Sequence, residues 1–357
     1  MSQVKRSLHP ELVRGAALTV FGTLLIAATY GMARFGVGLL HPAMAVERPG
    51  VAAALPSAAT AQFVSYCLAA GLAAPFVPRR SRVVAGVAGV VAGVGCLGLA
   101  VSTSAGWFVA SAFVGGAGAG LASPALVGLL DAVVPPRLAS AAQATVNAGT
   151  AVGVMGAGVL AGALDAPSVA WPIMAVLCLA PAAVVVVLTS GTVLADTPAP
   201  RTEGRMPNLT LPIAAAVGAG VISAAVWTYG PTEVVARGAL EPGQVGLLWM
   251  ALGLGGVAGA FIDGVVSRWG PRTAFLLFTA TLVVGSIGVL APNLGGWWWP
   301  LTGAAVFGAA YMALSGVLIL WGRLLDPPRG AAITAWLFIA LAIGQAIGAQ
   351  ALGSVFG

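Results

Sequence analysis

Residues 196–208 read DTPAPRTEGRMPN, the only sizeable polar stretch that follows the N-terminal segment. Its proline, glycine and charged residues are typical of a linker. Long apolar segments lie on both sides of it, with the length that a membrane-crossing helix needs. The stretch therefore divides the chain into two apolar halves. We expect an N-terminal bundle at 1–192, a cytoplasmic linker at 193–208 and a C-terminal bundle at 209–357.

The composition indicates a membrane protein. Of the 357 residues, 59% are hydrophobic and only 7% are charged, and the mean hydropathy is +1.00. A typical soluble domain is about one-quarter charged, so this chain has too few charges to cover a surface that faces water. This excludes a soluble enzyme, a nucleic-acid binder and a disordered protein. The 50 glycines favour close helix packing in lipid.

The apolar segments predict the number of membrane-crossing helices. Six precede the linker, at 15–44, 57–77, 83–102, 106–133, 139–164 and 168–189. Five follow it, at 209–235, 243–266, 273–290, 297–322 and 331–356. We therefore predict an all-α polytopic membrane protein of two helical bundles with about 11 transmembrane helices. If each bundle derives from a six-helix unit, the second lacks its last helix.

The basic residues indicate the orientation of the helices. With the N-terminus in the cytoplasm, most of the 16 lysines and arginines lie on the cytoplasmic side. These are Lys5, Arg6, Arg14, Arg79, Arg80, Arg82, Arg137, Arg201, Arg205, Arg268, Arg272, Arg323 and Arg329. Only Arg48 and Arg237 lie outside, and Arg34 lies within a span. This asymmetry follows the positive-inside rule, so the net charge of +6 is a topology signal. We expect a multi-pass protein of the inner, cytoplasmic membrane.

The two halves resemble each other. Pro-Pro-Arg precedes the segment at 139–164 and again the segment at 331–356, and the two copies begin at Pro135 and Pro327, 192 residues apart (327 − 135). Both segments also carry a stripe of small residues at helical spacing, which begins at Gly149 in the first and at Gly344 in the second. A duplicated helical unit, related by an axis along the membrane normal, explains these matches.

Several motifs resemble those of the major facilitator superfamily. Gly259-Ala-Phe-Ile-Asp263, followed by Arg268-x-Gly270-x-Arg272, is similar to the family's G-x-x-x-D-R-x-G-R-R motif, with an insertion before the arginine. The stretch 31–44, with Gly31-Met-Ala-Arg34-Phe35 and then Leu39-Leu40-His41-Pro42-Ala-Met44, resembles the YbfB/YjiJ-like branch. The segment at 106–133 departs from the family, because Ser111 occupies the position of its usual arginine.

The resemblance implies a secondary active transporter that alternates access to a central site between two bundles. It implies a small organic molecule as substrate and an ion gradient, that of the proton, as the driving force, with efflux as one direction. The serine at position 111 puts proton coupling by the family's usual device in doubt. The alternative is a membrane sensor or scaffold that keeps the fold without transporting.

Arg34 is the strongest candidate for a substrate-binding residue. A charge within a span costs about 2.5–3.5 kcal/mol or more, so the side chain should face a cavity or a partner. Tyr30 lies one turn away on the same face, and Phe35 follows. The guanidinium either binds an anionic or carbonyl-bearing substrate or hydrogen-bonds helix-end carbonyls as a packing device.

The other substrate-binding candidates are midspan polar and aromatic residues. Trp227 and Tyr229 precede Gly230-Pro231, where we expect an interrupted helix, and they line either the site or the membrane interface. The remaining candidates, Asn147, Tyr311 and Gln345, contact either substrate or a neighbouring helix. Gln62, Tyr66 and Ser315 are further polar residues within spans.

Five residues are candidates for gating or coupling. Asp263, Arg268 and Arg272 lie near the cytoplasmic end of a span, where we favour a gating salt bridge over a proton-carrying carboxylate. Glu233 lies at the outer end of the segment 209–235. His41 lies two turns beyond Arg34 and could sense pH, although a solvated position at the helix end is the favoured interpretation.

Enzymatic activity and cofactors are not expected. With His9 in the N-terminal tail and His41 as the other histidine, no Ser-His-Asp set can form within the membrane. The chain contains neither a phosphate-binding loop of the G-x-x-x-x-G-K-[ST] type nor an H-E-x-x-H zinc motif. The three cysteines lie in apolar runs and predict no metal site. We expect a monomer whose partners are a small-molecule substrate, protons and the lipid bilayer, with no nucleic acid.

Overall fold

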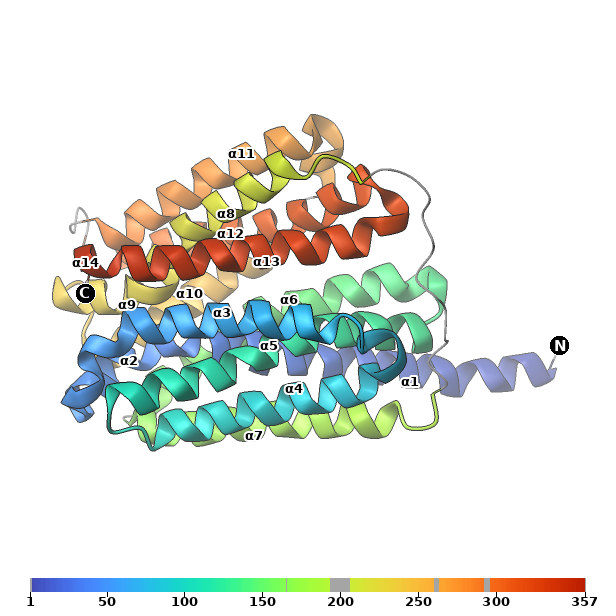
Figure 1. Cartoon of the computed structure of the whole chain (residues 1–357), viewed down its shortest axis with the longest axis horizontal. Helices are drawn as coiled ribbons and strands as arrows, with labels where there is room; N and C mark the ends of the chain where they lie inside the picture. The colour runs from blue at the N-terminus through green and yellow to red at the C-terminus, as the bar shows by residue number, and fades with distance from the viewer. Residues whose placement is uncertain (1, 165, 193–205, 260–262, 292–295, 357) are drawn as a thin grey trace.

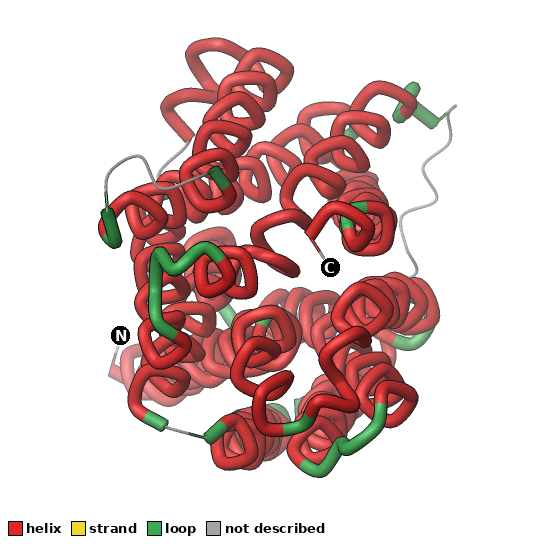
Figure 2. The backbone as a smooth tube through the Cα atoms, turned by 90° about the vertical axis from the view of Figure 1, so that its left-hand side faces the viewer, coloured by secondary structure: helices red, strands yellow, loops and turns green. Residues whose placement is uncertain are grey.

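The computed structural model describes residues 2–164, 166–192, 206–259, 263–291 and 296–356, and in these ranges the regular structure is helical, without strands. Ten of the described helical segments are long and apolar enough to cross a membrane, and Pro242–Ala258 is a shorter apolar one. The helices run side by side along the long axis of the molecule (Figure 1). Figure 2 shows most of them end-on, joined by short loops. The all-α polytopic architecture is confirmed.

The helices before the linker form one part of the molecule. They are α1 (Ser2–Ile26), η1 (Ala27–Arg34), α2 (Gly36–Glu47), η2 (Pro49–Ala54), α3 (Leu55–Ala73), α4 (Val77–Ala100), α5 (Ala105–Val133), α6 (Pro136–Ala163) and α7 (Pro167–Leu188). Arg14 donates hydrogen bonds to the carbonyl oxygens of Leu188 and Ser190, so α1 enters the bundle beside the end of α7. The predicted starts and ends of these spans agree with the helices to within a few residues, except in the first span and the basic loop described below.

The helices after residue 205 form the other part. They are α8 (Thr210–Ala224), η3 (Ala225–Tyr229), α9 (Gly230–Ala236), η4 (Pro242–Gln244), α10 (Val245–Ala258), α11 (Asp263–Leu290), α12 (Trp298–Leu325), η5 (Pro327–Arg329), α13 (Gly330–Ala351) and α14 (Gly353–Phe356). Figure 1 shows α8, α11, α12 and α13 on the opposite side of the molecule from α4 and α7. Residues 193–205 of the predicted linker lie outside the described residues.

The small-residue stripe of α6 lets it approach the first span closely. A Cβ atom on Gly149 would collide with the carbonyl oxygen of Thr23, and one on Gly153 with that of Ala27. The helices therefore pack backbone to backbone, as small residues allow in lipid. The predicted stripe is confirmed as a packing surface.

The second half repeats this contact at corresponding helices. A Cβ atom on Gly344 of α13 would collide with the carbonyl oxygen of Val217 in α8, and one on Gly348 would lie 2.7 Å from that of Val221. In this contact α13 corresponds to α6, and α8 corresponds to α1. The packing thus supports the duplication that the Pro-Pro-Arg copies suggest.

Contacts between helices of the first and second halves join the two parts. α3 packs against α13, α6 packs against α10, and α2 packs against α9 and η3. At the last contact, a Cβ atom on Gly38 would collide with the carbonyl oxygen of Trp227. The first and seventh spans therefore touch through their backbones where the two parts meet.

Both of these spans are interrupted. The prediction of one continuous helix over 15–44 is wrong, because η1 is a π-helical stretch that separates α1 from α2. In the second half the π-helical stretch η3 ends directly before Gly230, where the Gly-Pro pair predicts an interruption. Short π-helical stretches are rare and often occur at functional sites, which draws attention to the residues they carry.

The sequence predicts a loop at 78–82, between the spans at 57–77 and 83–102. The structure instead places this basic stretch within a helix. It lies in the first turns of α4, with a kink at Arg80, where φ is −134°. In the second half, α11 also contains a residue with non-helical backbone angles, Gly270, where φ is +75° and ψ is 164°. That left-handed φ favours glycine, so the residue can break the helix between the eighth and ninth spans without steric cost.

Candidate functional site

Arg34 ends η1 and lies in the interior of the molecule. Only 3% of its surface is exposed. Among the described residues no aspartate or glutamate forms an ion pair with it, and its Nε atom has no hydrogen-bond partner. A buried guanidinium without a carboxylate partner is costly, because no opposite charge offsets the loss of water.

Aromatic rings surround the guanidinium. Its Cζ atom lies 4.1 Å from the ring centroid of Tyr66, 4.8 Å from that of Tyr30, 5.1 Å from that of Phe63 and 5.3 Å from that of Phe35. Cation–π attraction is strongest where the cation is desolvated, at roughly 2 kcal/mol or more. These contacts offset part of the cost of burial but supply no negative charge.

A single amide provides the hydrogen bond to the charge. Gln345 of α13 accepts a hydrogen bond from Arg34 Nη2 at its Oε1 atom, 2.9 Å away. Its Nε2 atom donates to Tyr311 Oη at 3.2 Å and to Ser223 Oγ at 3.4 Å. Because the NH₂ group is held by these two hydroxyls, the amide oxygen points at the guanidinium. Side chains of both halves of the chain thus meet at one cation.

The aromatic ring of Phe35 continues this cluster into the second half. It stacks on Trp227 of η3, with ring centroids 3.8 Å apart and an interplanar angle of 17°. Trp227 in turn makes edge contacts with Trp249, Phe307 and Tyr311. The indole Nε1 of Trp227 is buried without a hydrogen-bond partner. The cluster therefore contains a second unpaired donor near Arg34.

The structure brings together five of the seven candidate substrate-binding residues. These are Arg34, Tyr30, Trp227, Tyr311 and Gln345. The other two lie apart. Asn147 accepts a hydrogen bond from Gln143 within α6 at 3.3 Å, and the Tyr229 hydroxyl donates to the carbonyl of Ala349.

His41 is buried, so the solvated position favoured from the sequence is wrong. Only 4% of its surface is exposed, and its Nε2 atom lies 3.0 Å from the carbonyl oxygen of Ala52. Its ring packs near Phe108, with centroids 6.3 Å apart. The short 3₁₀ helix η2 folds back over α2 and covers the imidazole, which the sequence did not predict.

The gating candidates fall in two places. Glu233 forms an ion pair with Arg237 one turn later, at 2.7 Å. This local pair at the end of α9 accounts for the carboxylate without a role in gating. Arg268 and Arg272 are exposed on either side of the break at Gly270. The side chain of Asp263 lies outside the described part, so the gating salt bridge remains a prediction.

Two contributors to the cluster were missed and two were noted without being selected. Phe63 and Ser223 were missed, while Gln62 and Tyr66 were seen only as midspan polar residues. Gln62 Nε2 donates to the carbonyl of Ala33 at 3.0 Å, beside Arg34. The signal was present in the spacing, since residues 62, 63 and 66 share one face of a helix at i, i+1 and i+4.

This arrangement has the features of a binding site for an anion. It offers a fixed positive charge, an unpaired N–H on that charge, flat aromatic walls and one neutral amide. It contains no nucleophile–base pair, so it is suited to holding a ligand rather than to covalent chemistry.

The fold and this central cluster define a polytopic helical transport protein. The sequence matches the family model of the Major Facilitator Superfamily over residues 16–349, and the chain belongs to this family. It is therefore a multi-pass membrane protein of a transporter family rather than an enzyme. A comparison with curated proteins gives no match.

Solved structures of transporters share the fold. A nucleoside transporter, NupG, has a TM-score of 0.73 at 11% identity, over 96% of this chain and 90% of that one. A bacterial homologue of the human lysosomal transporter Spinster, in an inward-facing and occupied conformation, has a TM-score of 0.70 at 15% identity, over 95% and 80%. The xylose transporter XylE from E. coli has a TM-score of 0.69 at 15% identity, over 96% and 92%. Identities this low show the common fold alone.

Proposed function

We propose that this protein is a secondary active transporter that moves a small organic anion by alternating access, with Arg34 as the residue that binds the negative charge. The observation that carries the proposal is the buried guanidinium, held between the two halves of the chain and without a carboxylate partner in the part of the chain that the structure describes. A charge kept inside a membrane protein at such a cost is a functional site by default.

The location of the cluster supports alternating access. Arg34 and its aromatic neighbours belong to the first and second spans, whereas Gln345, Tyr311 and Trp227 belong to the second half. A ligand that replaced Gln345 as partner of Arg34 would change the contacts that join the halves. Binding would thereby favour one arrangement of the bundles over the other, which is what coupling a ligand to a conformational change requires.

The remaining features of the proposal follow from the sequence. We infer two bundles at 1–192 and 209–357, a cytoplasmic N-terminus in the inner membrane, a monomer and a proton gradient as the driving force. Residues 31–44 support a place in the YbfB/YjiJ-like branch. The close backbone contact of Gly38 with Trp227, on the outer half of the proposed span, supports a state that is closed toward the outside.

An exchange assay with the full chain in liposomes tests the function. Liposomes loaded with an unlabelled organic anion are diluted into the same anion in labelled form, and a proton gradient is then imposed. We expect protein-dependent exchange, and accumulation under the gradient for a panel member that thermally stabilises the protein. An anion that stabilises the protein but is never exchanged would contradict transport and favour a sensor. A neutral sugar transported as well as any anion would contradict the substrate class.

A further inference from the structure

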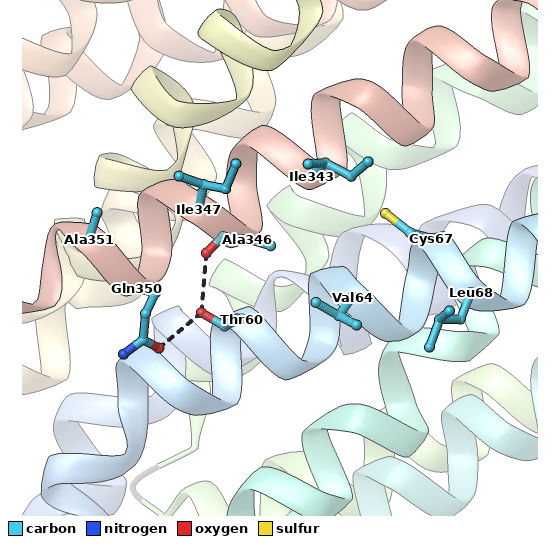
Figure 3. Close-up of a pocket in the computed structure, with 9 residues that line it drawn as sticks. All are labelled: Thr60, Val64, Cys67, Leu68, Ile343, Ala346, Ile347, Gln350 and Ala351. Carbon is cyan, nitrogen blue, oxygen red and sulfur yellow. Dashed lines mark hydrogen bonds between the residues drawn. The ribbon is translucent and has the colours of Figure 1, made fainter.

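An apolar groove of about 610 Å³ runs along the surface between α3 and α13 (Figure 3). Its volume is in the range of sites that hold small organic ligands. It is lined by Thr60, Val64, Cys67, Leu68, Ile343, Ala346, Ile347, Gln350 and Ala351. These two helices belong to different halves of the chain, so the groove lies on the seam that alternating access opens and closes.

The groove faces lipid rather than water. Leu68 is 52% exposed and Ile347 is 51% exposed, on helices that both qualify as membrane spans. Its polar groups cluster at one end, where the Thr60 hydroxyl donates to the carbonyl of Ala346 at 3.2 Å and lies 3.4 Å from Gln350 Oε1 (Figure 3). Apart from the Cys67 thiol, the rest of the lining is hydrocarbon.

Cys67 connects the groove with the Arg34 cluster. Its thiol lines the groove and lies 3.6 Å from the carbonyl oxygen of Ile339. Its neighbour in the chain, Tyr66, presents its ring 4.1 Å from the guanidinium carbon of Arg34. The Cys67 side chain packs against the small apolar cluster that contains Tyr66. Two consecutive residues of α3 therefore contact the lipid-facing groove and the buried charge, respectively.

We propose that the transported anion is amphipathic and reaches Arg34 sideways from the membrane through this groove, with its hydrocarbon tail in the groove and its anionic head at the guanidinium. The proposal rests on the proposed function and names its substrate class. Charge complementarity carries it, since Tyr66, the chain neighbour of the groove residue Cys67, contacts a buried cation. The groove offers the tail little gain over lipid, because lipid chains are equally apolar. The selectivity must then come from the head group.

Cys67 provides a natural probe of occupancy. The other two cysteines, Cys96 and Cys178, are buried at 1% and 0% exposure, whereas Cys67 is partly exposed. We would measure the rate at which a maleimide on a hydrocarbon chain labels the full chain in liposomes, with Cys67→Ala as the background. The test ligand is dodecane-1-sulfonate, which keeps its charge at all working pH values. Dodecan-1-ol, which has the same hydrocarbon tail without a charge, is the first control. Methanesulfonate, which has the anionic head without the tail, is the second.

We expect the long-chain sulfonate alone to slow labelling of Cys67, by about tenfold once its concentration is tenfold above its dissociation constant. In Arg34→Gln this protection should disappear. Equal protection by dodecan-1-ol, or protection that persists in Arg34→Gln, would show that ordinary hydrocarbon occupies the groove and would overturn the proposal. Protection by methanesulfonate alone would place a small water-soluble anion at Arg34 and would also overturn it.

A second variant separates this inference from the proposed function. Val64→Phe fills the groove, and Val90→Phe, on the lipid-facing surface of α4, is its matched control. We expect Val64→Phe to reduce exchange of the long-chain sulfonate about tenfold or more, while Val90→Phe leaves it unchanged. Unchanged exchange in both variants would overturn the lateral route but leave anion transport standing. Absence of anion exchange in the wild type, despite protection of Cys67, would instead contradict the proposed function.

Discussion

The rings of Phe35 and Trp227 stack on each other across the two halves of the protein, with centroids 3.8 Å apart. Both residues belong to the first span of their half, and each lies in or next to a π-helical stretch. The stacked rings therefore join the two halves at their interrupted first spans.

This stacking can be measured as a coupling between two substitutions. We expect Phe35→Leu and Trp227→Leu each to lower the free energy of unfolding, and the double variant to lose less than their sum by about 0.5–1.5 kcal/mol. Thermal unfolding in detergent provides the four stabilities of the cycle. Strict additivity would show that the two rings act independently.

Gln345→Glu should stabilise the protein and abolish anion exchange. The substitution is nearly isosteric and places a carboxylate at 2.9 Å from Arg34 Nη2, so the protein would supply the missing counter-charge itself. We expect a gain of about 1.5–3 kcal/mol in the free energy of unfolding and loss of anion exchange, because the ligand must now displace an internal ion pair. Gln244→Glu, at an exposed position in η4 away from both the cluster and the groove, is the control and should do neither. Retained exchange in Gln345→Glu would argue against Arg34 as the anion site.

Gly38→Ala should destabilise the contact between the first and seventh spans. Its Cβ atom would meet the carbonyl oxygen of Trp227, so α2 must move away from η3, at a cost of about 1–3 kcal/mol. Gly218→Ala in α8 is the matched control, because a Cβ atom there meets open space. The control should be neutral or stabilising by up to about 1 kcal/mol. Equal melting temperatures of the two variants would refute the close approach.

Glu233→Gln should leave transport nearly unchanged. Its carboxylate pairs with Arg237 on the same helix, and such a surface pair contributes only about 0.3–0.5 kcal/mol. Exchange rates measured as a function of pH should therefore keep the wild-type profile. A shift of the pH profile of exchange in Glu233→Gln would indicate that Glu233 takes part in coupling.

The sequence predicted the helical fold well because apolar segments of span length can be recognised without knowledge of any contact. The orientation that the basic residues indicate stays a prediction. The π-helical stretches were not predictable in the same way. At residues 27–34 nothing like the Gly-Pro pair of the second half marks the interruption, and the backbone there is shaped by its packing against α6 and α5.

The site was predictable in part for a related reason. Arg34 stands out because it is a charge within an apolar span, and Gln345 and Tyr311 because they are polar within one. Phe63 could not be distinguished from any other apolar residue, since its role depends on facing a cation from another helix. His41 was misjudged because η2, which covers it, follows α2 in the chain and folds back over it.

The most direct test of the account is the effect of anions on the thermal stability of the wild type and of Arg34→Gln. Without ligand, Arg34→Gln should unfold at the same temperature as the wild type or higher, because it removes a buried charge that no described carboxylate pairs with. With a bound sulfonate or carboxylate, only the wild type should be stabilised, by about 2.7 kcal/mol at a ligand concentration one hundred times the dissociation constant. Equal stabilisation of both proteins by the same anion would contradict the claim that Arg34 binds the substrate.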